Sequence, residues 1–102
     1  MKRKKPGIRT DLVKLWRTNV ADILQILHYT QADLAEVIGL SRQSVSKLFN
    51  DPEYRMTAVQ FLGSIYGIEE LINESDRDER FKTIALSLLD DLDKEYKQHG
   101  LH

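Results

Sequence analysis

The chain has 102 residues, of which 41% are hydrophobic and none is cysteine, and its formal net charge is −1. These values predict one globular unit with a modest core, and they exclude disulfides and thiol chemistry. No apolar run approaches the roughly 20 residues of a membrane span, and no secretory signal follows the basic start, so we expect a cytoplasmic protein without a membrane partner.

The chain is basic towards its start and acidic towards its end. Residues 1–50 hold nine Lys and Arg against four Asp and Glu, a charge of +5, and residues 51–102 hold six against twelve, a charge of −6. This asymmetry favours contact between the first half and a polyanion, although unevenly charged solvated helices would also produce it.

Residues 1–9 are predicted to form a basic, flexible arm, because Pro6 and Gly7 disfavour regular structure. Two interpretations stay open. The arm is either a disordered solubilising tail or a segment that lies along DNA phosphates or enters the minor groove. The side chains that would contact the DNA backbone are Lys2, Arg3, Lys4 and Lys5.

A helix is predicted over residues 11–27, with Thr10 as its cap and Asp11 in its first turn. An interruption near Thr18 and Asn19, where a second cap is available, is the alternative. Apolar side chains at helical spacing define the buried face, namely Leu12, Leu15, Trp16, Val20, Ile23, Leu24 and Leu27.

Residues 30–50 are typical of two short helices joined by a tight turn. Thr30 can cap the first helix, with Asp33 beside its positive end. Gly39 can take the left-handed conformation that ends this helix. Ser41 can then cap the second helix.

The second of these helices is amphipathic. Its buried side is formed by Val45, Leu48 and Phe49. Its other side carries Arg, Gln and Lys side chains, which can pair in the major groove with guanine, with adenine, and with guanine or phosphate, respectively. These side chains are Arg42, Gln43 and Lys47.

Seven residues agree in one register with the helix-turn-helix of phage-repressor and Cro proteins, namely Gln31, Leu34, Ala35, Gly39, Ser41, Val45 and Leu48. The chain resembles that family over residues 15–74. The resemblance implies an all-α fold, with a five-helix lambda-repressor-like domain over residues 10–74 and an additional long C-terminal helix. An αα-hairpin inside an ordinary helical bundle is the alternative.

The chain departs from the family at one pair of positions. Many members pair a buried Arg on the first helix with a Glu at the end of the recognition helix, and the matching positions here are Leu24 and Phe49. An apolar contact can replace such a pair without loss of stability. We therefore expect the fold to be kept, while the details of docking on DNA can differ.

Beyond the recognition helix, the sequence predicts a loop and two further helices. Pro52 is expected to end the recognition helix, because it restricts the residue before it and lacks an N–H. Thr57 can cap a fourth helix that runs to Tyr66, and Gly67 is expected to end that helix. A short fifth helix is predicted over residues 68–72.

Residues 75–98 are predicted to form an amphipathic helix outside the family core, followed by a frayed tail at residues 99–102. If the five-helix core is complete without it, its apolar face needs another partner, so we expect this face to form a dimer or to bind a partner protein. Packing on its own domain is the alternative. The face consists of Phe81, Ile84, Leu88, Leu89, Leu92 and Tyr96.

The sequence contains no glycine-rich phosphate loop, metal-ligand cluster or candidate catalytic triad. We therefore expect no enzyme activity, cofactor or metal. The resemblance instead implies a sequence-specific transcriptional regulator that binds double-stranded DNA, a repressor acting as a homodimer on a near-palindromic operator. The alternative is an antitoxin or phage-type accessory regulator whose acidic C-terminal helix binds another protein.

The resemblance also implies which residues would contact DNA. Gln31, at the start of the first motif helix, would contact a phosphate. The residues that would read bases are Arg42, Gln43 and Lys47. Contacts to phosphates or flanking bases would come from Ser41, Ser44 and Asn50.

Overall fold

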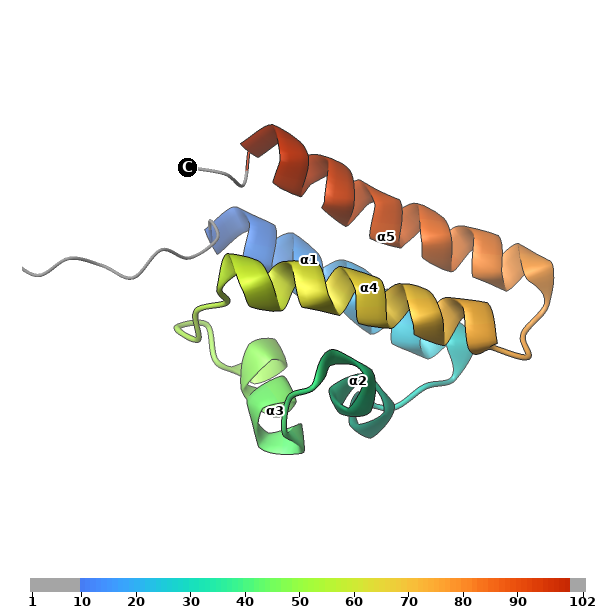
Figure 1. Ribbon diagram of the computed structural model, residues 1–102, viewed down its shortest axis with the longest axis horizontal. Coiled ribbons are helices and arrows are strands. Elements are labelled where there is room, and N and C mark those ends of the chain that lie inside the picture. The colour runs from blue at the N-terminus through green and yellow to red at the C-terminus, as the bar shows by residue number, and fades with distance from the viewer. Residues whose placement is uncertain (1–9, 100–102) are drawn as a thin grey trace, which may run out of the picture.

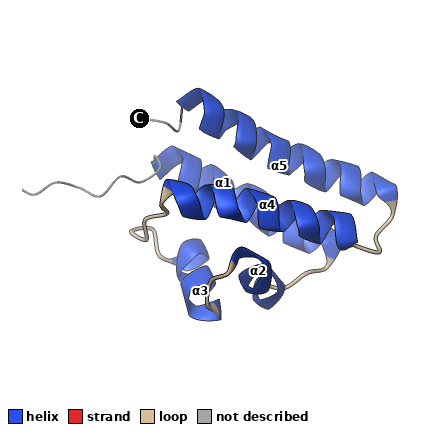
Figure 2. Ribbon diagram, in the orientation of Figure 1, coloured by secondary structure: helices blue, strands red, loops and turns tan. Residues whose placement is uncertain are grey.

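The structure is a computed structural model, and it describes residues 10–99 of the chain. The helices in this range are α1 (Thr10–Leu27), α2 (Gln31–Ile38), α3 (Arg42–Asn50), α4 (Ala58–Glu74) and α5 (Glu79–His99) (Figure 1). Loops connect them, and residues 10–99 contain no strand (Figure 2). The predicted all-α fold class is therefore confirmed.

Two predictions fall on parts of the chain that lie outside the described residues. One is the basic arm with Lys2, Arg3, Lys4 and Lys5, and the other is the tail over residues 100–102. Within the described range, no helix is both long enough and apolar enough to cross a lipid bilayer.

α1 is continuous from Thr10, so this residue belongs to the helix rather than preceding it as a cap. The alternative of a break near Thr18 and Asn19 is wrong. Asn19 is buried, and its Nδ2 donates to the backbone oxygen of Leu88 in α5 at 2.9 Å. A buried amide needs such a partner, and here the partner joins α1 to α5.

α4 is one helix of 17 residues, so the predicted break at Gly67 and the separate short helix over residues 68–72 are wrong. Gly67 has a different role, because a Cβ at this position would lie 2.7 Å from the backbone oxygen of Val37 and 3.1 Å from Cγ2 of Ile38. The missing side chain therefore lets α2 approach α4 closely. Gly67 does not take the positive φ that would end a helix, and α4 continues through it.

α5 packs on its own domain, mainly against α1 and also against α4 (Figure 1). This packing contradicts the expectation that the core is complete without this helix and agrees with the alternative that it packs on its own domain, while a dimer or partner contact stays a prediction for the part of the face left exposed. Among the six residues predicted for that face, Ile84 is 49% exposed, Phe81 and Leu88 are partly buried, and the fully buried residues are Leu89, Leu92 and Tyr96.

The expectation failed because the core is not complete at Glu74. The rings of Phe61 in α4 and Tyr96 in α5 stack with centroids 5.1 Å apart, so α5 covers apolar surface that α4 presents. α5 also begins later and ends later than predicted, at Glu79 and His99, so His99 is helical rather than part of a frayed tail.

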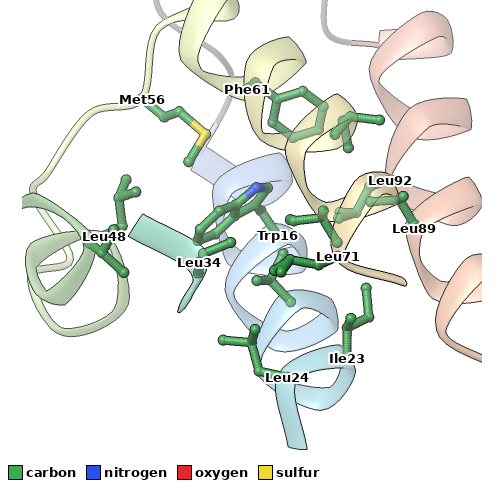
Figure 3. Close-up of a cluster of buried hydrophobic side chains, with 14 of the residues drawn as sticks. Trp16, Ile23, Leu24, Leu34, Leu48, Met56, Phe61, Leu71, Leu89 and Leu92 are labelled. Carbon is green, nitrogen blue, oxygen red and sulfur yellow. The ribbon is translucent and has the colours of Figure 1, made fainter. Parts of the chain in front are cut away.

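Trp16 occupies the centre of the core and is fully buried (Figure 3). Its Nε1 donates to Ser64 Oγ in α4 at 2.8 Å, and that hydroxyl donates to the backbone oxygen of Phe61 at 2.6 Å. Its ring packs against Phe49 of α3 with centroids 5.3 Å apart. One side chain of α1 thus contacts both α3 and α4.

We expect Gly67→Ala to lower the free energy of unfolding by about 1–3 kcal/mol, because the backbone of α2 must move to admit the methyl group. Gly63→Ala in the same helix is the matched control, since a Cβ there meets nothing within 4 Å. That control should raise stability by about 0.5–1 kcal/mol. Urea unfolding of dilute protein, followed by Trp16 fluorescence, measures both changes. Equal effects at the two positions would contradict the close approach at Gly67.

Candidate nucleic-acid interface

The turn between α2 and α3 has the local chemistry that the sequence predicts. Thr30 and Asp33 form a capping box at the start of α2, in which Asp33 Oδ2 accepts from the Thr30 N–H at 2.8 Å. Gly39 ends α2 in the left-handed conformation, with φ 71° and ψ 26°, and its N–H donates to the backbone oxygen of Ala35. The predicted roles of Thr30, Asp33 and Gly39 are therefore confirmed.

Ser41 caps α3, as predicted. Its Oγ accepts from the Ser44 N–H at 3.1 Å, and the two hydroxyl oxygens lie 3.0 Å apart in a hydrogen bond. Ser41 is exposed and Ser44 is partly buried. Because the first turn of a helix carries unpaired N–H groups and the positive end of the helix dipole, this end of α3 favours an anion such as a phosphate.

α3 is held in the domain by its apolar side. Val45 and Leu48 are fully buried, and Phe49 is partly buried against Trp16. The helix ends at Asn50, and Asp51 is its C-cap. Pro52 follows at once, so the predicted end of the recognition helix is confirmed.

The opposite side of α3 is polar and exposed. Arg42, Gln43, Lys47 and Asn50 all lie on this side, as the sequence predicts. The structure adds Ser46, which is exposed between them and accepts a hydrogen bond from Asn50 Nδ2 at 3.2 Å. Its position four residues after Arg42 and four before Asn50 was the available sequence signal, because such residues share a helix face.

Gln31 is separate from this group in the sequence, since it is the first residue of α2, and it is exposed. A phosphate beside it would meet the N-terminal end of α2, where unpaired N–H groups and the helix dipole favour negative charge. In the described residues, no three His, Cys, Asp or Glu side chains are placed to hold a metal ion.

Comparison with known families matches residues 20–65 to the helix-turn-helix family. This segment is a helix-turn-helix domain of the Cro/C1 type. The match contains all of α2, the turn and α3, and it supports a DNA-binding transcription regulator. Neither the comparison with curated proteins nor the comparison with solved structures gives a match.

Two contacts that hold α3 come from outside the matched part of the Cro/C1-type domain. One is the packing of Trp16 on Phe49. The other is Arg17, whose Nε donates to the backbone oxygen of Leu48 and whose Nη2 donates to that of Asp51 at 2.6 Å. A cation near the C-terminal carbonyls of a helix also complements the negative end of the helix dipole.

Sequence reasoning missed Arg17. Nothing in its spacing distinguishes it from Lys14, the other cation of α1, and its partners are backbone oxygens, which have no residue identity to match. The contact depends on α1 lying beside the C-terminal end of the recognition helix, 31 to 34 residues away in the sequence. This proximity becomes visible only in the folded structure.

We expect Arg17→Ala to lower the free energy of unfolding by about 1–2 kcal/mol, because it removes two hydrogen bonds from a charged donor. DNA binding should also weaken, because the end of the recognition helix is then held less firmly. Lys14→Ala removes an equal charge from an exposed position on the same helix and is the control. Urea unfolding and a binding titration measure the two effects. If Arg17→Ala behaves like Lys14→Ala in both, Arg17 does not position α3.

Proposed function

We propose that this chain is a transcriptional repressor that binds a near-palindromic operator as a homodimer. The observation that carries the proposal is the exposed polar side of α3, where Arg42, Gln43 and Lys47 are directed away from the core. The apolar side of the same helix is buried. A helix held in this way can enter the major groove without exposing apolar surface.

The side chains on this face have the chemistry that base recognition requires. Arg42 can donate two hydrogen bonds to guanine, and Gln43 can exchange a pair with adenine. Lys47 can contact guanine or a phosphate. Ser41, Ser44 and Asn50 are proposed to contact phosphates or flanking bases, and Gln31 to contact a phosphate from the start of α2.

The basic arm is proposed to add contacts that do not depend on sequence. Lys2, Arg3, Lys4 and Lys5 account for four of the nine Lys and Arg in residues 1–50. Each phosphate that such a side chain neutralises releases a counterion from the duplex, which favours binding at low salt. The arm would then strengthen binding to all sequences alike.

A dimer follows from the reach of a single domain. α3 has nine residues and is therefore about 13 Å long, so one copy reads only one half-site. Two copies related by a two-fold axis present two such helices to half-sites about 34 Å apart. Occupation of promoter DNA by this dimer would block transcription.

The alternative of an antitoxin-like or accessory regulator rested on an exposed apolar face at the C-terminal helix. Leu89, Leu92 and Tyr96 are buried against the same chain. These three side chains therefore offer no exposed apolar surface to a protein partner. We therefore favour the repressor.

We expect Arg42→Ala and Gln43→Ala each to cost about 1–3 kcal/mol of binding to the best site selected from random duplexes, and to relax preference at one base pair. Lys94→Ala is the control, because it removes a cation from α5, where Lys94 pairs with Asp90 at 3.0 Å. Affinity is measured by fluorescence anisotropy at fixed salt. Parent-like binding of both α3 variants would show that this face does not read bases.

We expect deletion of residues 1–7 to weaken binding to specific and unrelated duplexes by similar factors. The dependence of log affinity on log salt should become shallower by about 0.9 for each phosphate that the arm no longer neutralises. Replacement of the four basic residues by Gln, which keeps the length of the arm, separates charge from chain length. An unchanged salt dependence in both variants would mean that the arm does not touch DNA.

A further inference from the structure

α4 carries an apolar surface that residues 10–99 leave uncovered. Val59 is 81% exposed and Tyr66 is 70% exposed, and Leu62 beside them is partly buried. No charged residue occurs between Met56 and Ile68. Leu62 and Tyr66 also line a groove of about 660 Å³ between α4 and α5, in which apolar side chains such as Leu86 lie beside charged ones such as Glu69 and Asp90.

Gly63 lies in the middle of this surface and is exposed. A glycine inside a helix costs stability relative to alanine, so its presence calls for a reason. At Gly67 the reason is the backbone of α2, but a Cβ at Gly63 would meet nothing within 4 Å. No contact among the described residues therefore requires glycine at this position, whereas close approach by another molecule's backbone would require it.

We propose that a second copy of this chain packs its α4 antiparallel against this surface, with the two helices crossing at Gly63. This inference rests on the proposed dimeric repressor and locates its interface. In a two-fold contact, residue i meets residue j and j meets i. If Val59 of each copy meets Tyr66 of the other, then Leu62 meets Gly63, so a large side chain faces a missing one.

The charges at the two ends of the surface are of opposite sign, which fits an antiparallel arrangement. Arg55 precedes the uncharged stretch and Glu70 follows it, and both are exposed. Arg55 lies in the loop before α4, which begins at Ala58, and Glu70 lies on α4 four residues after Tyr66. The antiparallel arrangement therefore brings the loop with Arg55 of one copy towards the end of the surface that carries Glu70 in the other. The two-fold axis produces this pair twice. A parallel arrangement would bring like charges together instead.

The position of α4 in the domain suits a dimer that binds DNA. α2 and α3 lie on one side of α4, and α5 lies on the other (Figure 1). Consider a two-fold axis that is perpendicular to α4 and runs from the α5 side to the α3 side. This axis makes the α4 helices of the two copies antiparallel, and it leaves both α3 helices on the same side of the dimer. One duplex could then contact both recognition helices.

The test is Gly63→Gln in the full chain, with the molar mass measured by sedimentation equilibrium without DNA. The monomer has open space at Gly63, and Gln is a good helix former, so the variant should fold and resist urea at least as well as the parent in dilute solution. Its dimer dissociation constant should rise about tenfold or more, because the added side chain lies where the helices cross.

Ile84→Gln is the control, because Ile84 is the exposed member of the face predicted for α5. The parent and this control should both be dimers at micromolar concentration. A monomeric parent, a Gly63→Gln variant with unchanged dimer affinity, or a dimer that only Ile84→Gln disrupts would each overturn the proposal. Copurification of an unlike chain that Gly63→Gln releases, with a monomeric parent, would overturn the choice of partner.

The charge pair provides a second, independent measurement. Arg55→Glu and Glu70→Arg should each weaken the dimer, and the double variant should recover most of the parent's affinity. Absence of recovery would overturn the antiparallel register. The Gly63→Gln variant should bind a duplex with one half-site as tightly as the parent does. Loss of half-site binding in the parent would count against the proposed DNA recognition, whereas an unchanged dimer affinity of the variant would count against this interface alone.

Discussion

The buried indole of Trp16 is the contact on which the orientation of the recognition helix depends. Its N–H is removed from water and must be paired, and the Ser64 hydroxyl of α4 accepts it at 2.8 Å. The same ring packs against Phe49 of α3. A shift of α3 relative to α4 would therefore disturb either the aromatic contact or the hydrogen bond. Arg17 is the next residue of α1, and it adds hydrogen bonds to the end of α3. One turn of α1 thus fixes the helix that we propose enters the major groove.

This arrangement explains how the chain can differ from the family pattern at Leu24 and Phe49. The usual ion pair between the first helix and the end of the recognition helix is replaced by two other links between the same elements. Phe49 supplies an apolar contact with Trp16, and Arg17 supplies hydrogen bonds to backbone oxygens rather than to a carboxylate. A link to backbone oxygens needs no acidic partner to be buried, so it avoids much of the desolvation cost of a buried ion pair.

Features set by local chemistry could be predicted from the sequence, and features set by packing between distant segments could not. Thr30, Gly39 and Ser41 act within one turn of the chain, through a side-chain cap or a left-handed backbone at the end of a helix. Gly67 was misjudged because a glycine can end a helix or admit a neighbour, and only the position of Val37 decides between these roles. The face of α5 was misjudged for the same reason, since its amphipathic pattern specifies burial but not the surface that buries it. The exposed face of α3 was predictable because the spacing of its apolar residues and its Ser41 cap can both be identified within the helix's own sequence.

The uninterrupted course of α4 links the fold to the proposed dimer. Each side of this helix meets a different neighbour: Ser64 meets α1, Gly67 meets α2, and Phe61 meets α5. The side with Val59, Gly63 and Tyr66 remains. Had Gly67 ended the helix, Glu70 would not lie on the same helix as Val59 and Tyr66, and the surface would lack its acidic end. Because Gly67 admits α2 without ending α4, one continuous helix carries both the side that packs in the core and the exposed side with Val59, Gly63 and Tyr66. Two glycines four residues apart then have matching roles, one towards α2 within the chain and the other towards a second copy.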